Sequence, residues 1–383
     1  MEKISEKKSE QNVCSCERKS ISDICKIVTG KLNANAMTEN GQYRFFTCAD
    51  EIYKIDNYAF DGQALLVAGN GYLGSVKYYN GKFNAYQRTY VLMDFSECVE
   101  IRYAYYHMSC FFRAHALKQQ KEGSVPYITI AAFNNYEIPL PSLSFQQEIV
   151  RTLDIFNSII SNLERELSSR QKQYNNYREQ LFTRAEGEVK SLGSLGVFEN
   201  IGTDKKTIPG ERIVTLLNYV DVYHNKFIDK SIPSMRVSAS EKKCLNCTVE
   251  KGDIFVTPSS ETIDDIGHSA VITETIEGAI YSYHIMRYRL HDVNMTTACY
   301  INYIFDTYAV KSQILKKAQG LTRYGLTKEK FASIEIPFPS IQKQKEIVSI
   351  LDTYEAIISN LKQEIAARQK QYEYYREKLL TFQ

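Results

Sequence analysis

One long segment occurs twice in this chain of 383 residues. The stretch that opens with Glu137-Ile-Pro-Leu-Pro-Ser142 returns 198 positions later as Glu335-Ile-Pro-Phe-Pro-Ser340, and the match continues without a gap. From Glu137 to Thr183, 27 of the 47 positions are identical to their partners in the second copy. A period close to half the chain length predicts a pseudo-symmetric molecule with two lobes, because solenoid proteins repeat every 20–50 residues or so.

The repeated segment carries the periodicity of a coiled-coil helix. Apolar or aromatic side chains alternate at spacings of four and three residues, an average of about 3.5 over roughly five heptads. These seam positions are Ile149, Leu153, Phe156, Ile160, Leu163, Leu167, Tyr174, Tyr177 and Leu181 in the first copy, and Ile347, Leu351, Tyr354, Ile358, Leu361, Ile365, Tyr372, Tyr375 and Leu379 in the second. Arg170 and Arg368 interrupt the two seams, and we expect each either to fix the register or to extend outward.

Both helices are expected to begin after a proline, with Ser142 and Ser340 as N-caps. About 40 residues at a rise of 1.5 Å give a rod roughly 60 Å long. One helix cannot bury its apolar stripe alone, so we expect the two helices to pair with each other. The alternative is that each seam recruits a separate partner chain.

The composition is that of an ordinary soluble protein with room for two globular domains: 44% of residues are apolar, 24% are charged, and the net charge is +2. No uncharged apolar stretch of about 18 residues and no signal-peptide pattern is present, so we expect a cytoplasmic protein with reduced cysteines. Cys14-Ser-Cys16 and Cys244-Leu-Asn-Cys247 each look like half of a zinc site. No second pair of ligands stands at finger spacing near either, so we expect no metal.

Two segments of mixed α/β pattern separate the helices. Lys19-Ser-Ile-Ser-Asp-Ile24 resembles Lys190-Ser-Leu-Gly-Ser-Leu195, so both lobes open alike. Further in, the apolar runs Gly62–Val67 and Gly252–Val256 correspond, and each is followed by a turn signal. The framework recurs while the loops diverge. This pattern predicts one fold with two different ligands, although neutral drift of a duplicated domain would leave it too.

The predicted organisation is a polar arm at 1–18, a first globular domain at 19–141, a first long helix at 142–184, a second globular domain at 185–339 and a second long helix at 340–383.

The sequence contains none of the catalytic motifs that we sought. There is no Gly-x4-Gly-Lys-Ser/Thr phosphate loop, and the chain has no Pro-Pro dipeptide, so the Pro-Pro-Tyr/Phe motif of amino-methyltransferases is excluded. Gly69-Asn-Gly-Tyr-Leu-Gly74 lacks the following helix and acidic residue of a dinucleotide loop, and we interpret it as a turn. The six histidines show no metal-ligand spacing. We therefore expect no enzymatic activity from this chain alone.

The duplicated order of these features resembles the specificity subunits of type I DNA restriction–modification systems. The resemblance covers about residues 19–383. It rests on Ile138-Pro-Leu-Pro141 and Ile336-Pro-Phe-Pro339, each of which leads into a helix start rich in Gln and Glu. It also rests on the segments upstream of these motifs, Gly123-Ser-Val-Pro-Tyr-Ile128 and Gly320-Leu-Thr-Arg-Tyr-Gly-Leu-Thr327.

The resemblance implies a mixed α/β (α+β) fold with two target-recognition domains, separated by two long helices that form an antiparallel coiled coil. In such systems the non-catalytic specificity subunit reads a split sequence on double-stranded DNA, two half-sites around unspecified bases. It docks two adenine methyltransferase subunits, which carry S-adenosylmethionine, and restriction or motor subunits can join them. The chain itself would hold no cofactor. A rigid rod of about 60 Å spans fewer than about 18 base pairs, so the spacer should be fixed.

Candidate DNA contacts are polar, basic and aromatic side chains near turns, because amide and guanidinium groups donate to base edges and phosphates. In the first lobe they are Asn70, Tyr72, Lys77, Asn80, Lys82, Asn84, Gln87 and Arg88. In the second lobe they are Lys205, Lys206, Ser259, Ser260, His268, Tyr283, His284, Arg323 and Tyr324. The alternative is that the aromatic residues belong to the core and the lysines are merely solvated.

Partner contacts are predicted at helix residues that recur in both copies, since two identical partners need the same surface twice. These are Lys172, Tyr174, Arg178 and Glu179 in the first helix, and Lys370, Tyr372, Arg376 and Glu377 in the second. A function of a different class stays open, a coiled-coil scaffold whose lobes bind proteins without DNA. A nuclease or methyltransferase in its own right is disfavoured by the missing motifs.

Overall fold

The computed structural model describes residues 16–382. The chain divides into two compact units by its internal contacts: unit 1 is Met1–Arg165 with Lys362–Gln383, and unit 2 is Glu166–Leu361. Most of the expected N-terminal arm, residues 1–15, lies outside the described residues. Glu17 and Arg18, which we had assigned to that arm, already belong to the first strand.

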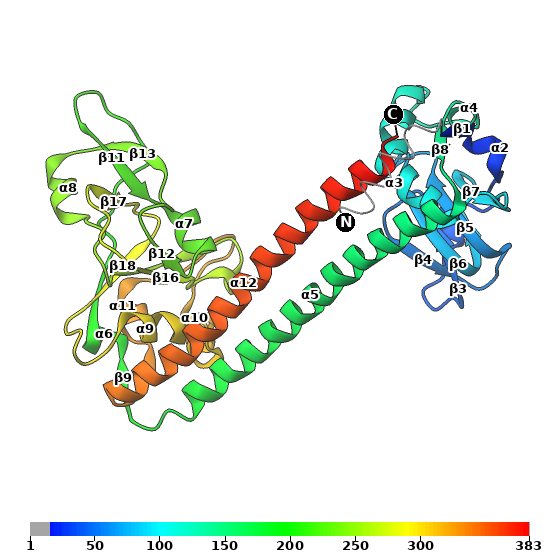
Figure 1. Cartoon of the computed structure of the whole chain (residues 1–383). Coiled ribbons are helices and arrows are strands. Elements are labelled where there is room, and N and C mark those ends of the chain that lie inside the picture. The colour runs from blue at the N-terminus through cyan, green and yellow to red at the C-terminus, as the bar shows by residue number, and fades with distance from the viewer. Residues whose placement is uncertain (1–15, 383) are drawn as a thin grey trace. The chain divides into compact units, whose positions relative to one another are not determined.

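Each unit holds one lobe together with half of each long helix. The long helices are α5 (Leu143–Thr183) and α12 (Ile341–Leu380), drawn in green and in orange to red in Figure 1. Within residues 16–382, no helix combines the length and the apolar character that a membrane span needs.

The lobe of unit 1 is built on one six-stranded sheet, in the order β2-β7-β5-β6-β3-β4. Neighbouring strands are antiparallel except β3 and β6, which are parallel. The elements of this lobe are β1 (Glu17–Ser20), α2 (Ile21–Ile24), β2 (Lys26–Thr29), η1 (Ala34–Ala36), β3 (Tyr43–Phe46), β4 (Ile52–Ile55), β5 (Phe60–Ala68), β6 (Val76–Ala85), β7 (Thr89–Met93), α3 (Ile101–Gln119), α4 (Ala131–Asn134) and β8 (Glu137–Leu140).

Helix α3 supplies the other half of this lobe's core. Its small and apolar residues at Ala104, Met108 and Phe112 recur every four positions and form one buried stripe. That stripe packs against Leu65 and Leu92 of the sheet, so burial of an amphipathic face, together with the N-capping side chain that precedes the helix, accounts for α3.

The lobe of unit 2 uses corresponding strands in two separate sheets. Their orders are β10-β18-β14-β16-β12 and β13-β11-β17. The elements are β9 (Glu188–Ser191), α6 (Leu192–Leu195), β10 (Gly196–Glu199), β11 (Arg212–Leu217), α7 (Tyr219–His224), β12 (Phe227–Ile228), β13 (Met235–Ala239), α8 (Glu241–Asn246), β14 (Ile254–Val256), β15 (Ser259–Ser260), η2 (Ile263–Asp265), β16 (Ser269–Ile272), β17 (Ala279–Tyr281), β18 (Met286–Leu290), α9 (Ala298–Ile304), α10 (Tyr308–Lys317), β19 (Tyr324–Gly325), α11 (Lys328–Ala332) and β20 (Glu335–Phe338).

The two lobes therefore share a framework but differ in how its halves join. β10-β18-β14 repeats the pairing of β2-β7-β5, and β17-β11-β13 repeats the pairing of β6-β3-β4, including its single parallel contact. In unit 1 the two halves meet because β5 pairs with β6. In unit 2, β16 and β12 occupy that edge of β14 instead, so the sheet is split. The expectation of one common fold holds for the strand pairs and not for the joined sheet.

The Ile-Pro-x-Pro motifs close the lobes. Each forms a two-stranded antiparallel ladder with the segment that opens its own lobe, β8 with β1 and β20 with β9. Proline lacks an N–H donor and is tolerated at such an edge. The carbonyl oxygens of Pro139 and Pro337 accept hydrogen bonds from Tyr103 and Tyr300, at 2.8 and 2.7 Å. The motif thus holds the end of each lobe to the strand that opens it and to a helix of the same lobe.

Two buried glutamines anchor the starts of the long helices in the same way. Gln146 donates to the carbonyl oxygens of Cys98 and Pro141, at 2.9 and 2.8 Å, and accepts from the Glu100 N–H. Gln344, 198 positions later, donates to Met295 and Pro339 and accepts from the Thr296 hydroxyl. Both side chains are fully buried. Every polar atom of each amide is used, which orients the first turn of each helix against its lobe.

The predicted antiparallel pairing of the long helices is confirmed. In unit 1, Phe156 of α5 packs on Tyr375 of α12, with 5.9 Å between ring centroids. In unit 2, Tyr177 of α5 stacks on Tyr354 of α12 at 5.5 Å. The early part of one helix thus meets the late part of the other. Tyr177, a predicted seam residue, is nevertheless 47% exposed.

The ends and the interruptions of the helices behave largely as expected. The Ser340 hydroxyl accepts a hydrogen bond from the Lys343 N–H at 3.3 Å, as an N-cap does. Ser142 precedes α5, but the contact of its hydroxyl is with Ser144. Arg170 and Arg368 extend outward, and each binds a glutamate four residues earlier on its own helix.

Candidate nucleic-acid interface

Three loops of the second lobe bring predicted contact residues together. Ser259 and Ser260 form β15, which pairs with β19 at the base of the hairpin Gln319–Gly325. The guanidinium of Arg323 donates to the Ser259 hydroxyl through Nε and Nη2, both at 3.3 Å. The loop of Lys205 runs beside Tyr283 and His284, because Thr203 bridges to Ser282. The pKa of His284 is lowered by partial burial and by the positive charges of Lys205 and Arg323.

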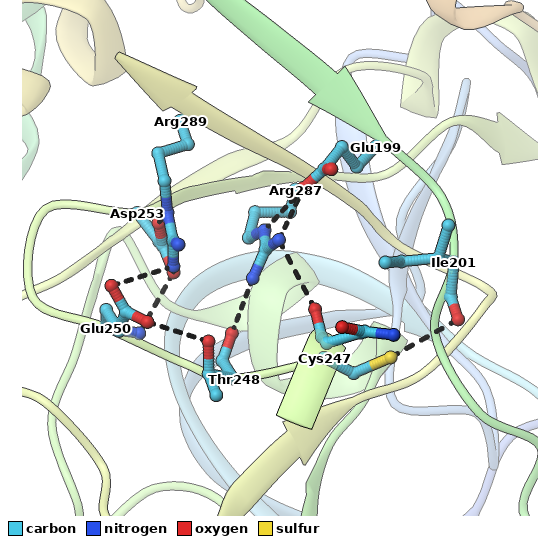
Figure 2. Close-up of polar contacts among 9 residues, drawn as sticks. Glu199, Ile201, Cys247, Thr248, Glu250, Asp253, Arg287 and Arg289 are labelled. Carbon is cyan, nitrogen blue, oxygen red and sulfur yellow. Dashed lines mark hydrogen bonds and ion pairs between the residues drawn. The ribbon is translucent and has the colours of Figure 1, made fainter. Parts of the chain in front are cut away.

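A buried polar network holds the strands behind this surface. Arg287 of β18 forms an ion pair with Glu199 and donates to the Thr248 carbonyl oxygen at 2.9 Å, as Figure 2 shows. The thiol of Cys247 donates to the Ile201 carbonyl oxygen at 3.3 Å. That oxygen and Gly202 also accept from Lys243. The loop that carries Lys205 therefore starts from a fixed point.

Cys247 of the second cysteine pair belongs to this network. Cys247 is buried as a thiol whose pKa is raised by burial, and Cys244 contacts the Ala239 carbonyl oxygen. Among residues 16–382 the structure groups no set of His, Cys, Asp and Glu side chains that would hold a metal ion. Cys14, half of the other predicted pair, lies outside the described residues.

The first lobe builds a matching surface from the matching loops. Asn70 bridges to Tyr127 at the base of the hairpin Lys121–Tyr127. The Gly69 N–H donates to the Arg88 carbonyl oxygen, and the Arg88 guanidinium lies over the Tyr127 ring, 5.1 Å from its centroid. Gln87 is exposed beside Arg88, and Tyr72 is exposed just beyond Asn70. Four of the eight predicted contacts in this lobe thus lie on neighbouring loops.

The other four candidates lie on β6 and differ in availability. Asn80 and Lys82 are exposed, although the Lys82 ammonium lies 4.6 Å from the Tyr58 ring centroid. Lys77 is half-buried and donates to the carbonyl oxygens of Ala49 and Asp50, and burial lowers its pKa.

The prediction that Asn84 contacts DNA is wrong. Its side chain is only 5% exposed. It donates to Asn57 at 2.8 Å and accepts from the Ala85 N–H, so this buried amide holds a turn and does not face DNA.

In the second lobe, Tyr283 is exposed, Tyr324 is half-buried in β19, and Lys206 is exposed but paired with Asp204 at 2.9 Å. The backbone of His268 pairs with Thr257, two residues before Ser259, but its side chain contacts other residues. Its ring packs on Tyr223 at 4.4 Å, beside Asp265, and the charges that act on it come from Lys311, Asp306 and Lys226. We therefore remove His268 from the candidate contacts.

Most of the predicted partner residues on the helices serve contacts inside the chain. Tyr174 is 3% exposed and belongs to the core of unit 2. Arg178 covers its ring, and Glu179 accepts from the Tyr308 N–H at the start of α10. These three residues pin the end of α5 to the second lobe.

The recurrence in α12 has the same cause. Arg376 covers the ring of Tyr372, and its charge acts on Cys110 of α3, 198 positions before Tyr308. Tyr372 packs on Phe156 in the core of unit 1. Only Lys172, Lys370 and Glu377 of the predicted set remain exposed. The other predicted residues recur because each helix end packs on a lobe of this chain, and the two lobes are equivalent. The prediction that these residues contact partner subunits was wrong.

A groove that the sequence did not reveal also recurs in both units. In unit 1 it lies along the start of α5, has a volume of about 550 Å³, and is lined by Val150, Asp154 and Ile155 among others. In unit 2 it lies along the start of α12, has a volume of about 680 Å³, and is lined by Val348 and Asp352 among others. The aspartates accept from Tyr106 and Tyr303, which fixes each groove wall to its lobe.

Two stretches of the chain, residues 15–170 and 194–367, match the family described as type I restriction modification DNA specificity domain. Each match contains most of one lobe and much of the helix that follows it. The chain belongs to this family of DNA specificity domains. As a specificity subunit it has the function of DNA sequence recognition. The loop surfaces around Arg323 in the second lobe and Arg88 in the first are the candidate sites for it.

Known proteins of this kind resemble the chain over much of its length. The EcoR124I/EcoR124II specificity subunit of Escherichia coli is 30% identical over 303 residues, 74% of this chain and 71% of that one. The EcoDI specificity subunit of Escherichia coli is 41% identical over 135 residues, which cover 35% of this chain and only 29% of the relative. The crystal structure of an S subunit from M. genitalium superimposes with a TM-score of 0.61 at 15% identity, covering 96% of this chain and 97% of that one.

The sequence signals missed two features of this specificity subunit. Leu321 and Val125 stand exposed in the two hairpins, although both lie inside the segments that carried the resemblance. Gln146 and Gln344 were noted only as part of a Gln/Glu-rich helix start. Their equal spacing of 198 residues was the available signal for a shared structural role.

Proposed function

We propose that this specificity subunit reads a bipartite sequence on double-stranded DNA, one half-site per lobe, with unspecified bases between them. The observation that carries the proposal is that two loop surfaces have the same construction but different side chains. Ser259 and Arg323 occupy one, and Asn70 and Arg88 occupy the other. In a family of DNA specificity domains, equivalent surfaces with different donors fit two different half-sites. The chain contributes recognition and no chemistry of its own.

Charge supports a role for partners in DNA affinity. The net charge is only +2, and one candidate cation, Lys206, is paired with Asp204 within the chain. The logarithm of the DNA-binding constant falls as the logarithm of the salt concentration rises, and each phosphate contact makes this slope more negative by about 0.9. We expect a shallow slope for the chain alone and a steeper one for its complex. Tight binding with a steep slope by the isolated chain would overturn this part of the proposal.

The partners proposed are two adenine methyltransferase subunits, which carry S-adenosylmethionine, and restriction or motor subunits in addition. The recurring grooves beside Val150 and Val348 are the surfaces that we propose for the methyltransferases, since two identical partners need equivalent sites. Ile155→Glu should remove one methyltransferase from the complex, and adding Thr353→Glu should remove both. Light scattering of the purified complexes measures the mass. Glu164→Ala, on an exposed part of α5 outside the groove, is the control.

Retention of two methyltransferase subunits by the double variant would show that the grooves are the wrong surface. Sequence specificity is tested separately, by selecting bound duplexes from a randomised pool with the complex. Two enriched half-sites at one spacing support the bipartite reading. Enrichment of no sequence, with protein partners captured by the lobes, would favour a scaffold without DNA recognition.

A further inference from the structure

The hairpins at the two loop surfaces occupy the same place in their lobes. In the second lobe Gln319 pairs with Gly325, and in the first lobe Lys121 pairs with Tyr127. Each residue of the first pair lies 198 positions after its counterpart in the second pair. After each hairpin, the next N–H donates to the strand-end loop of the lobe, Leu326 to Pro258 and Ile128 to Gly69, both at 2.9 Å. Positions within the hairpins can therefore be compared one by one.

The comparison places an arginine in one lobe against a valine in the other. Arg323 corresponds to Val125, and both are exposed, Val125 to 51%. The residues at the strand-end loop beside them also differ, Ser259 in the second lobe and Asn70 in the first. One position of a common framework thus presents a cation in one lobe and an apolar group in the other.

The orientation of Arg323 is set before any ligand arrives. The Nε and Nη2 atoms on the inner edge of the guanidinium both donate to the Ser259 hydroxyl. The described residues offer Arg323 no carboxylate partner, so the outer edge, with one hydrogen on each terminal nitrogen, remains available. Two parallel N–H donors match O6 and N7 of guanine in the major groove.

The hairpin also has the shape of an element that reaches into a groove. Gly320 has φ +148, and a Cβ atom there would lie 1.9 Å from the Arg323 carbonyl oxygen, so the turn is tight. Leu321 at its tip is 94% exposed. The bridge between Thr203 and Ser282 brings the loop of Lys205 beside His284. The pKa of His284 is lowered by burial and then by the charges of Lys205 and Arg323, against the opposite effect of Asp204.

We propose that Arg323 and Val125 are equivalent specificity residues, each reading one base pair of its own half-site. Arg323, positioned by Ser259, recognises a guanine through N7 and O6, and Val125 contacts the 5-methyl group of a thymine. This inference rests on the proposed bipartite recognition and adds which chemistry each lobe reads at one matched position.

The test uses the complex with its methyltransferase subunits on duplexes that carry the selected sequence. Replacing one guanine of the second lobe's half-site by 7-deazaguanine removes N7 alone. Because O6 still accepts from Arg323, this change should weaken binding by the unaltered complex by less than the about 5- to 150-fold that a whole bidentate contact contributes. The Arg323→Ala complex should bind the two duplexes equally. Thymine-to-uracil replacement in the other half-site should weaken binding unless Val125→Ala is present.

Further variants separate a base contact from a phosphate contact. Arg323→Lys keeps the charge but not the planar fork, so it should lose sensitivity to 7-deazaguanine while keeping its affinity for nonspecific DNA. Ser259→Ala should reduce that sensitivity and leave binding to nonspecific DNA unchanged. Circular dichroism of each variant checks folding, and an exposed side chain should be replaced without loss of structure.

Four results would overturn the proposal. Unaltered sensitivity to 7-deazaguanine in Arg323→Ala would show that another residue reads N7. An equal loss of affinity on all duplexes would assign Arg323 to a phosphate. A second half-site without guanine would end the proposal while leaving bipartite recognition intact. If the unaltered complex selects no sequence, bipartite recognition itself fails and this inference fails with it.

Discussion

Single buried polar side chains join the parts of each lobe, and His107 in α3 is one of them. Its Nδ1 atom pairs with the Tyr136 hydroxyl at 2.9 Å, and the ring is enclosed by aromatic neighbours. Burial, with a smaller contribution from the positive Arg18, lowers the pKa of His107 to about 3 from its ordinary 6.5. The imidazole therefore stays neutral in the folded protein at all moderate pH values.

This pKa predicts that acid destabilises the fold through His107. In the unfolded chain the imidazole takes up a proton as the pH falls through 6.5, whereas in the folded chain it does so only near pH 3. Between these values the unfolded state binds more protons. The free energy of unfolding therefore decreases as the pH is lowered, by at most about 1.4 kcal/mol per pH unit. Denaturant unfolding of His107→Gln from pH 6 to pH 4 should show a shallower dependence than the unaltered chain. The exposed His291→Gln serves as control, and identical slopes for all three proteins would contradict the assignment.

At the scale of elements, the buried glutamines make the helix starts part of the lobes. Gln344→Ala would leave the Thr296 hydroxyl and the carbonyl oxygens of Met295 and Pro339 without their partner. Loss of a buried hydrogen-bond partner costs about 1–3 kcal/mol, so the free energy of unfolding should fall by at least that amount. Gln342→Ala, at an exposed position of the same turn, should change it by less than about 0.5 kcal/mol. Equal effects of the two changes in urea titrations would refute the anchoring role.

The elements also show how far sequence reasoning reaches in this chain. Strict heptads and a repeated Ile-Pro-x-Pro boundary predicted α5 and α12 and their pairing, because helix periodicity is local and strong. The split sheet of the second lobe was not predictable, since β12 joins the edge of β16 from a distant part of the chain, a contact that local sequence patterns do not reveal. Tyr174 illustrates the same limit at a site: a seam residue that recurs twice was taken for a partner surface, and only the packing of α5 on the second lobe shows why it recurs.

At the scale of the whole molecule, each long helix begins in one unit and ends in the other. α5 begins in unit 1 and finishes in the core of unit 2, and α12 does the reverse. Tyr174 is buried in unit 2, and Leu379 and Phe382 are buried in unit 1. The two lobes are therefore linked by two helices and not by one.

This linkage predicts that helix length governs the spacer of the DNA target. Seven residues inserted after Leu163 and after Leu361 keep the heptad register and add about 10.5 Å, the length of about three base pairs. DNA with the original spacer should no longer be methylated by the altered complex, and any remaining activity should need a longer spacer. Seven residues inserted after the exposed Gly210 of a lobe loop should change nothing. Retention of the original spacing by the lengthened helices would contradict the prediction.

The most direct measurement for the central claim is a map of methylated adenines in cells that express this chain with a cognate adenine methyltransferase subunit. The account predicts methylation within one bipartite motif of fixed spacer, and none when the chain is omitted. It further predicts that exchanging one lobe for that of a relative changes only one half of the motif. Methylation at a single continuous motif, or methylation that does not depend on this chain, would contradict the claim that its two lobes read two half-sites.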